Sequence, residues 1–175
     1  MSEENLAVEL DRLVQGAEKI VFLTGAGIST ESGIPDFRSP GGLYSDPGKA
    51  NVFEIGSFLA APERFYLFAR DFLLLLDRAR PNPAHLALAR LEAARQVTVV
   101  TQNIDGLHRK AGSTRLWCVH GDFWRSACVS CGHSVPTEAL RPEIEQGRVP
   151  RHGCGGFYRP LVTFFGEPLP ALDWE

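Results

Sequence analysis

His120 stands between Val119 and Gly121, after an apolar run and within the sequence Val-His-Gly-Asp-Phe. Imidazole titrates close to neutral pH, so a histidine at the end of a strand is a candidate general base. A single histidine is more often structural than catalytic, and the chain has four others, at positions 85, 108, 133 and 152. The position at a strand end favours His120 over these four.

A second group of polar residues follows the apolar run Val97–Thr101, in the sequence TQNIDGLHRKAG. Sheets of α/β proteins bind ligands beyond the carboxyl ends of their strands, which is where Gln102, Asn103 and Asp105 stand. The alternative is that Asn103 or Asp105 caps a helix that continues through Leu107.

A third group begins with Gly25-Ala26-Gly27, directly after the apolar run Ile20–Thr24. Backbone N–H groups of such a loop, with a helix beginning behind it, can approach a phosphate closely. The third glycine of the dinucleotide fingerprint is missing at the required spacing, and a plain strand–turn–helix junction is the alternative. The following Asp36-Phe37-Arg38 provides an acid, an aromatic face and a guanidinium, which suit a cationic aromatic ring beside phosphates.

Four cysteines are present: Cys118, Cys128, Cys131 and Cys154. Cys128 and Cys131 form a Cys-x-x-Cys pair, and the acidic, amphipathic N-terminus does not resemble an export signal. In such a chain the pair indicates metal binding or redox chemistry before a disulfide, and we expect a cytoplasmic location.

The elements needed to position these groups can be expected from periodicity. Apolar runs predict buried strands at Ile20–Thr24, Val97–Thr101, Leu116–Val119 and Leu161–Phe165, and helical spacing predicts helices over Glu3–Gln15, Pro62–Arg78 and Pro83–Arg95. A short helix should begin after Gly27, and residues 36–50 should form a long loop. Strands that alternate with helices indicate a parallel α/β sheet.

Composition limits the class of protein. The chain has 175 residues, of which 44% are hydrophobic, which suits one domain of ordinary size. Its net charge of −3 gives no basic field for nucleic acid, so we expect no direct nucleic-acid binding. The longest apolar run, Phe72–Leu76, is too short to span a membrane.

These motifs occur together, in the order GAGIST…SGIPDFRS, TQNIDGLH, VHGDF, Cys-x-x-Cys and GGFYRPLVTFFGEPLP. From about Val21 to Pro170 the chain resembles the bacterial-type sirtuins, which are NAD-dependent protein deacylases. The resemblance implies a Rossmann-like parallel sheet with a small inserted zinc-ribbon-like module. By this resemblance the NAD-binding domain comprises residues 1–120 and 157–175, and the module comprises residues 121–156.

The resemblance also implies roles for particular residues. His120 is expected as the general base, with Asn103 as a second catalytic residue. The NAD co-substrate is expected to contact Gly25, Ala26, Gly27, Ile28, Asp36, Phe37, Arg38, Gln102, Asn103, Ile104 and Asp105. An acetyl-lysine protein or peptide is expected to pair with the strand of Val162, Phe164, Phe165, Gly166 and Glu167 by β-augmentation. An ordinary core strand is the alternative, and Thr163 occupies a position where an apolar residue is more usual.

The expected reaction begins with loss of nicotinamide, a cationic leaving group, and capture of the ribose by the positioned acyl oxygen. A ribose hydroxyl then attacks, which requires the base, and the acetyl group leaves on ADP-ribose. Two alternatives remain open: a mono-ADP-ribosyltransferase that uses the same nicotinamide loss, and a non-catalytic remnant.

The chain departs from the family pattern in its zinc ligands. Family members usually carry two Cys-x-x-Cys pairs, but the second pair here is Arg151-His152-Gly153-Cys154. Arginine does not replace a cysteine ligand, whereas His152 can supply a nitrogen. A structural Cys₃His zinc site of Cys128, Cys131, Cys154 and His152 is one interpretation, and a module without metal is the other.

Two further departures concern the substrate and the C-terminus. Sirtuins that remove acidic acyl groups resemble one another in a Tyr-x-x-Arg motif, but here Tyr66 is followed at that spacing by Ala69, with Arg70 one residue later. We therefore expect a preference for acetyl over succinyl groups. The family pattern continues past Glu175 with a strand, a Gly-Thr-Ser motif and further strands. We expect a natural extension of roughly 60–80 residues, enough for the other half of a nucleotide-binding sheet, and doubtful activity without it.

Overall fold

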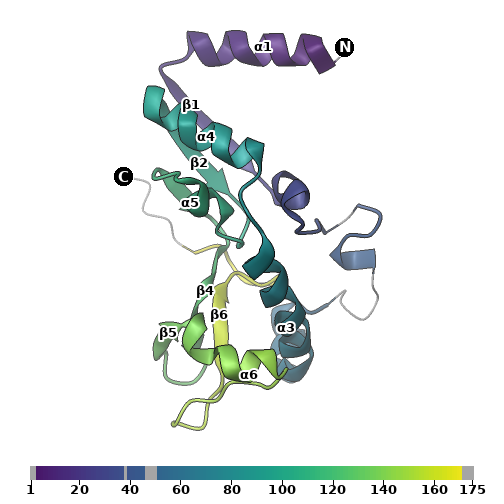
Figure 1. The fold of residues 1–175 in the computed structure, drawn as a ribbon. Helices are drawn as coiled ribbons and strands as arrows, with labels where there is room; N and C mark the ends of the chain where they lie inside the picture. The colour runs from purple at the N-terminus through teal and green to yellow at the C-terminus, as the bar shows by residue number, and fades with distance from the viewer. Residues whose placement is uncertain (1–2, 38, 46–50, 171–175) are drawn as a thin grey trace.

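The structure is a computed structural model that describes residues 3–37, 39–45 and 51–170. Two three-stranded sheets lie in different halves of the molecule, with helices packed beside them (Figure 1). Arg38, which the sequence places in the cofactor loop, lies outside the described residues, as do residues 46–50 of the predicted long loop. No helix of the described part is both long and apolar enough to cross a membrane.

The first sheet is parallel, as predicted, with strand order β1-β2-β3. Its strands are β1 (Lys19–Thr24), β2 (Gln96–Thr101) and β3 (Leu116–Cys118). Thr24 pairs with Thr101, and Thr101 with Cys118, so all three strands end at the same edge. The glycine loop, the Gln102–Asp105 segment and His120 follow these three strand ends and are therefore brought to one place.

Helices connect the strands of this sheet. The 3₁₀ helix η1 (Ala26–Ser32) follows β1, α4 (Pro83–Ala94) precedes β2, and α5 (Leu107–Ala111) lies between β2 and β3. The predicted helix after Gly27 is thus present, but with 3₁₀ geometry. Asn82 begins α4, because its side-chain oxygen accepts hydrogen bonds from the backbone amides of Ala84 and His85. A single turn, η2 (Leu43–Ser45), lies within the predicted long loop.

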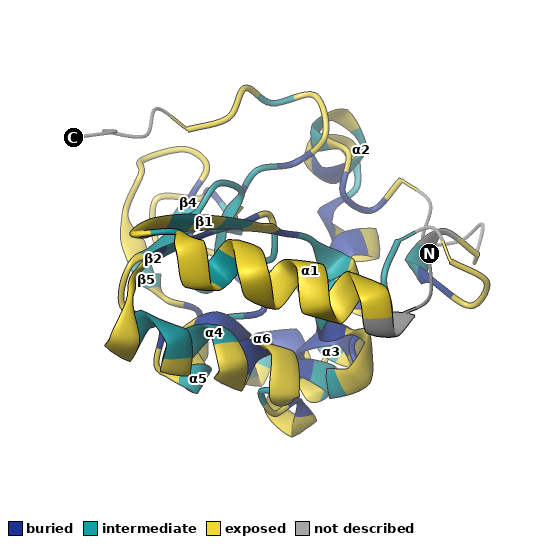
Figure 2. Cartoon of the chain, turned by 90° about the horizontal axis from the view of Figure 1, so that it is seen from above, coloured by how far each residue is buried: buried dark blue, intermediate teal, exposed yellow. Residues whose placement is uncertain are grey.

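One expectation for this sheet is wrong. A continuous apolar run such as Ile20–Thr24 predicts a strand buried on both faces, but Val21 and Leu23 are 67% and 69% exposed. The helix α1 (Glu3–Gly16) forms as predicted, yet its apolar residues Leu6, Leu10 and Leu13 are at least half exposed. Figure 2 shows α1 and part of β1 in the colour of exposed residues. Apolar periodicity located both elements but did not determine what covers them.

The second sheet is antiparallel, with strand order β5-β4-β6. It consists of β4 (Gly121–Cys128), β5 (Ser134–Pro136) and β6 (Tyr158–Val162), and the short helices η3 (Thr137–Leu140) and α6 (Arg141–Glu145) follow β5. β6 begins and ends three residues before the predicted strand at Leu161–Phe165. Phe165 instead forms an isolated parallel bridge with Glu54, outside the sheet.

The core lies around α3 (Pro62–Arg78) and the shorter α2 (Ile55–Ala60), which the sequence did not predict. The helix predicted over Pro62–Arg78 is confirmed, and the apolar residues at helical spacing on its inner face are all buried: Phe65, Phe68, Ala69, Phe72 and Leu76. Phe58 of α2 contacts an aromatic cluster whose other members are Phe65, Tyr66, Phe157 and Phe164. Segments distant in the sequence are therefore joined mainly by aromatic packing.

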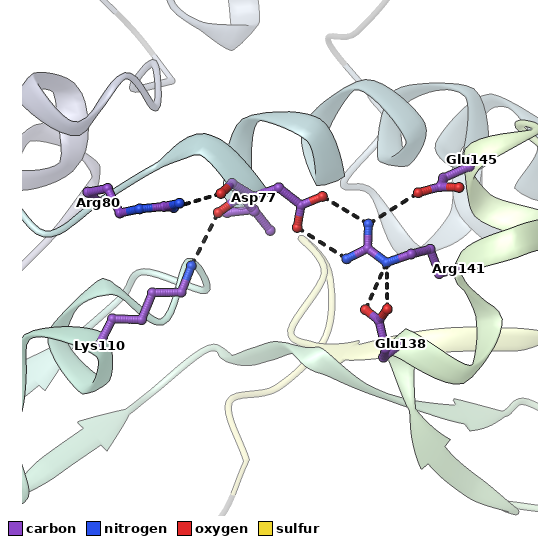
Figure 3. Close-up of polar contacts among 7 residues, drawn as sticks. Asp77, Arg80, Lys110, Glu138, Arg141 and Glu145 are labelled. Carbon is purple, nitrogen blue, oxygen red and sulfur yellow. Dashed lines mark hydrogen bonds and ion pairs between the residues drawn. The ribbon is translucent and has the colours of Figure 1, made fainter.

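Arg141 links α3 to the small module (Figure 3). Its guanidinium donates to both carboxylate oxygens of Asp77, at 2.9 and 3.1 Å, and also pairs with Glu138 and Glu145. Nearby, Arg80 donates to the backbone carbonyl of Asp77, and Lys110 donates to that of Leu76. These cations satisfy carbonyls in the last turn of α3, where positive charge is favourable.

Candidate functional site

A pocket of about 390 Å³ lies where the carboxyl ends of the parallel strands meet the end of β6. This volume is within the range of small-molecule sites. The pocket brings together most of the residues predicted from the sequence. Its lining includes Ala26, Ser29, Asp36, Phe37, Gln102, Asn103, Ile104, Asp105, His120, Val162, Thr163 and Phe165.

The glycine loop has open space beside it. Gly25 has extended backbone, with a φ of −135°, so its conformation does not require glycine. A Cβ atom placed on Gly25 or Gly27 would meet no atom of the chain within 4 Å. The backbone at these two glycines is therefore open on the side where a side chain would stand. This leaves room for a phosphate-containing ligand such as NAD beside the loop.

Hydrogen bonds from the Gln102–Asp105 segment fix the glycine loop. Asn103 donates from Nδ2 to the carbonyl of Gly25 and to Oγ of Ser29, at 3.0 and 3.1 Å. The Ser29 hydroxyl donates to Oδ2 of Asp105 at 2.7 Å. The other oxygen of Asp105 accepts from the backbone amide of Leu107 at the start of α5, at 2.8 Å. Asp105 precedes Gly106, the N-cap of α5, and therefore binds the first amide of this helix while it also borders the pocket.

The sequence analysis missed a buried histidine pair behind this loop. His85 and His108 are 0% and 1% exposed, and their ring centroids lie 4.8 Å apart. Nε2 of His108 is 3.0 Å from the Thr24 hydroxyl, and Nδ1 of His85 is 3.0 Å from Oδ1 of Asn82. Asn82 in turn donates to the carbonyl of Ile28 in η1 at 2.7 Å. Through Thr24 and Asn82, the pair therefore connects the end of β1 to η1.

The pair is uncharged near neutral pH. Burial, followed by the neighbouring His85, lowers the pKa of His108 to about 4, against an opposite effect of Asp105. Burial also lowers the pKa of His85. One feature of the sequence could have indicated that His85 is buried: it lies on a largely apolar helix, shortly after the capping Asn82 and Pro83. Nothing in the sequence distinguished His108 from an ordinary helical residue.

His120 is half-buried and borders the pocket. Its Nδ1 lies 3.0 Å from the backbone carbonyl of Gln102. A carbonyl can only accept, so this contact places the proton of neutral imidazole on Nδ1 and leaves Nε2 with a lone pair. The His120 carbonyl accepts from the amide of Thr163 at 2.9 Å, which ties this histidine to the segment after β6.

The predicted substrate strand forms one wall of the pocket. Phe165 is 56% exposed, whereas Phe164 is 1% exposed, belongs to the aromatic core and is not part of the pocket lining. The backbone of Phe165 is engaged on one side, because its amide donates to Phe53 and its carbonyl accepts from Ile55. The carboxylate of Glu167 is paired with Arg159. Val162 and Phe165 line the pocket, whereas Phe164, Gly166 and Glu167 do not, and contacts of all five residues with a substrate stay predictions.

A model of the Sir2 family matches residues 25–174. The chain belongs to the Sir2 family. It is 41% identical over 178 residues to NAD-dependent protein deacetylase 2 of Caldanaerobacter subterraneus subsp. tengcongensis, covering 99% of this chain and 71% of that protein. It is 43% identical to the NAD-dependent protein deacetylase of Thermotoga maritima, covering 90% of this chain and 65% of that protein.

Solved structures agree with this assignment. A Sir2 structure with p53 peptide and NAD+ superimposes with a TM-score of 0.82 at 41% identity, covering 93% of this chain and 65% of that one. Sir2 bound to acetylated peptide gives a TM-score of 0.82 at 38% identity, covering 97% and 67%. The fold is therefore Rossmann-like, with a small second module. The chain spans about two thirds to seven tenths of the length of these Sir2 proteins.

The small module of this Sir2 chain brings the predicted metal ligands together. The ligand atoms of Cys128, Cys131, His152 and Cys154 all lie within 4.8 Å of one another. The sulfur atoms of Cys128 and Cys154 are 3.6 Å apart, close to the roughly 3.8 Å that two thiolates span across a tetrahedral zinc. Nδ1 of His152 is 3.3 Å from the sulfur of Cys131. The donor set fits a Cys₃His zinc site.

The surroundings of this cluster suit a bound thiolate. Burial opposes ionisation of Cys128, but hydrogen bonds from the backbone amides of Cys131 and Ser130, together with those to the thiols of Cys154 and Cys131, lower the pKa of that thiol. A Cβ atom on Gly156 would lie 2.7 Å from the Cys128 sulfur, so only glycine leaves this space open. His133 stacks on His152 with centroids 4.8 Å apart and contacts the Tyr158 hydroxyl at 3.0 Å. Cys118 lies on β3, away from the cluster.

The predicted preference for acetyl groups depends on Tyr66, Ala69 and Arg70, and the structure shows where these three residues lie. The Tyr66 hydroxyl donates to the Tyr158 carbonyl at 2.7 Å, and Ala69 is fully buried. Arg70 is directed to Asp71, 2.8 Å away, and its side chain is 43% exposed. Among the described residues that line the pocket, none is a lysine or arginine.

Proposed function

We propose that this Sir2 chain acts as an NAD-dependent protein-lysine deacetylase that releases nicotinamide and transfers the acetyl group to ADP-ribose. The observation that carries the proposal is a single pocket bordered by the glycine loop, by His120 and by the segment after β6. Relatives more than 40% identical are named NAD-dependent protein deacetylases. A similar solved structure is named as Sir2 with p53 peptide and NAD+.

The glycine loop and its supports would hold the NAD. Gly25 and Gly27 leave the backbone of the loop open to a ligand, and Ala26 and Ser29 of the same stretch line the pocket. Bound NAD supplies an electrophilic ribose carbon and a cationic leaving group. Phe37 and Ile104 provide apolar surface in this region, while Asp36, Gln102 and Asn103 provide polar groups. The carbonyl of Ile28, within η1, accepts a hydrogen bond from the side chain of Asn82, which helps to hold this helix in place.

His120 would act as the general base. The Gln102 carbonyl fixes the proton on Nδ1, so Nε2 is the atom that accepts a proton from a ribose hydroxyl. The Thr163 amide donates to the carbonyl of His120, so the backbone of the base is bonded directly to the substrate wall.

The substrate would be an extended acetyl-lysine peptide that lies along the segment after β6. Val162, Thr163 and Phe165 border the pocket there. Because Arg70 pairs with Asp71 and the described lining holds no lysine or arginine, a carboxylate on the acyl group would be desolvated without a cationic partner among the described residues. Acetyl-lysine should therefore be preferred over succinyl-lysine.

The proposed location is the cytoplasm. No disulfide joins the four cysteines, all of them in the described part of the chain, and this suits a reducing compartment.

The test is to incubate the chain with NAD and an acetylated peptide and to identify the products by mass spectrometry. The proposal predicts equal amounts of nicotinamide, deacetylated peptide and O-acetyl-ADP-ribose, with slower turnover of the matched succinyl peptide. Transfer of ADP-ribose onto protein without deacetylation would support the ADP-ribosyltransferase instead. Absence of both products from a folded, NAD-binding chain would overturn the proposal.

A further inference from the structure

An ion pair joins Arg159 in β6 to Glu167. It spans the segment between them, which forms the pocket wall after β6. The two side chains meet as a fork, with both nitrogen–oxygen distances at 2.6 Å. Their side chains are only 19% and 22% exposed. Paired parallel hydrogen bonds of this kind fix direction as well as distance, which a single contact between flexible side chains does not.

Both partners also bind backbone within the segment they enclose. Arg159 donates from Nη2 to the carbonyl of Val162 at 2.9 Å, and Oε2 of Glu167 accepts from the amide of Phe164 at 2.9 Å. The guanidinium carbon lies 4.9 Å from the centre of the Phe164 ring. The backbone is therefore fixed on each side of Thr163, and the guanidinium of Arg159 lies over the ring of Phe164.

Thr163 passes this constraint to the base. Its amide donates to the carbonyl of His120, while Phe165, two residues later, is bound through its backbone to Phe53 and Ile55. Thr163 and Phe165 both border the pocket, whereas the guanidinium and carboxylate of the pair do not. A change in the pair would reach the pocket only through this wall and through His120.

We propose that Arg159 and Glu167 are positioning residues that hold the acyl-lysine wall at Thr163–Phe165 and, through the Thr163 amide, the backbone of His120. The inference deepens the proposed function and rests on it. It assigns Glu167 a role through the segment it closes, in place of direct contact with the peptide. The glycine loop is fixed separately, by Asn103 and Asp105, so NAD binding should not depend on the pair.

The experiment compares Glu167→Gln and Arg159→Lys with the wild-type chain. Glutamine keeps the shape of Glu167 but loses the charge, and lysine keeps the charge of Arg159 but cannot form the fork. Glu9→Gln is the matched control, because it makes the same change in the exposed pair Glu9–Arg12. Steady-state kinetics with acetylated peptide, NAD binding by calorimetry and amide hydrogen exchange are measured for each.

A KM for peptide raised at least about 10-fold in Glu167→Gln, with a smaller rise in Arg159→Lys, is the expected result. NAD affinity should stay within about twofold, and Glu9→Gln should match the wild type. If only kcat falls, and it falls in proportion to the fraction of folded protein, then Arg159 and Glu167 have a merely structural role. A normal Arg159→Lys beside a defective Glu167→Gln would show that Glu167 acts on the peptide directly. Either result overturns the proposal.

Hydrogen exchange separates this inference from the proposed function. In Glu167→Gln the amides of Thr163 and Phe164 should exchange at least about 10-fold faster, while that of Val99 in β2, which donates to the Arg115 carbonyl, should be unchanged. This outcome does not depend on turnover. Unchanged exchange at Thr163 and Phe164 would overturn the positioning role even in an active enzyme, whereas faster exchange in an inactive chain would overturn only the deacetylase assignment.

Discussion

The two sides of the pocket are held by different forces. On the NAD side, polar side chains support the glycine loop: half-buried Asn103 and the buried Ser29, Asn82, His85, Asp105 and His108 bind one another, the backbone or the Thr24 hydroxyl. On the peptide side, an aromatic core around Phe58 and Phe164 carries the wall, and the Arg159–Glu167 pair closes it. Hydrogen bonds orient the first side, and burial of apolar surface stabilises the second.

This difference predicts distinct sensitivities. A buried polar network costs free energy when a member is charged or left unpaired, so the NAD side should respond to pH. An aromatic core responds mainly to loss of volume. Conditions that weaken one side should therefore leave the other largely intact, and the following changes separate the two.

The largest effect on stability should come from truncating the aromatic core. Phe58 is 1% exposed and contacts four other aromatic rings. Phe58→Ala should lower the free energy of unfolding by about 3–5 kcal/mol, because it removes buried surface and leaves a cavity. Urea denaturation measures this directly. Leu59→Ala, at the adjacent half-exposed position, is the control and should cost less than about 1 kcal/mol. Equal costs at the two positions would contradict the assignment of this core.

Acid should weaken the NAD side. The folded chain holds the pKa of His108 near 4, below its ordinary value of 6.5, so the unfolded chain binds the proton first. Its contribution to stability is complete above pH 6.5 and falls as the pH drops from 6.5 towards 4, by up to about 3 kcal/mol. Protonation would add charge at a buried nitrogen that has no partner among the described residues.

Unfolding measured between pH 4 and 7 tests this expectation. His108→Gln removes the titrating group and should flatten the profile, although stability at pH 7 is also reduced. A wild-type profile that is already flat between pH 4 and 6.5 would show that the pair is not held neutral by burial.

Removal of the fourth metal ligand should affect the small module alone. His152→Ala leaves three thiolates, so zinc affinity should fall at least about 100-fold. Competition with a chromogenic chelator measures the affinity, and NAD binding should be unchanged. Arg151→Ala, at the neighbouring exposed residue, should retain zinc. Stoichiometric zinc with unaltered affinity in His152→Ala would show that His152 is not the fourth ligand.

The smallest change should separate binding from stability. Gly25→Ala adds one methyl group that meets no atom of the chain within 4 Å, at a backbone conformation open to any residue. The free energy of unfolding should change by less than about 0.5 kcal/mol. NAD affinity should nevertheless fall at least about 10-fold, because the methyl group occupies space beside the loop. Unchanged affinity in calorimetry would show that no ligand approaches the backbone there.

The sequence predicted those parts of the fold in which local pattern and tertiary packing agree. α3 has both an N-terminal proline and an apolar face that is buried in the aromatic core, and its predicted bounds, Pro62–Arg78, are those of the structure. β1 was located correctly but its burial was not, because a continuous apolar run does not specify which neighbours cover Val21 and Leu23. β6 lies earlier than predicted, because its pairing with β4 is set by a partner distant in the sequence.

The candidate site was predicted better where motifs were dense. Gln102, Asn103, Asp105 and His120 line one pocket because parallel strands end at one edge. His85, His108 and Arg159 were missed, since their importance depends on contacts with residues far along the chain. The shift of one position from the usual second cysteine pair was visible in the sequence, and the structure places His152 within the cluster.

The most direct test of the account is the activity of His120→Ala. The account predicts that deacetylation of an acetylated peptide falls by about 10²–10⁴, because the base is lost, while the melting temperature and NAD affinity of the same preparation stay close to those of the wild type. Mass spectrometry of the peptide, with calorimetric NAD binding alongside, supplies both readings. Deacetylation by His120→Ala at the wild-type rate would contradict the assignment of His120 as the base.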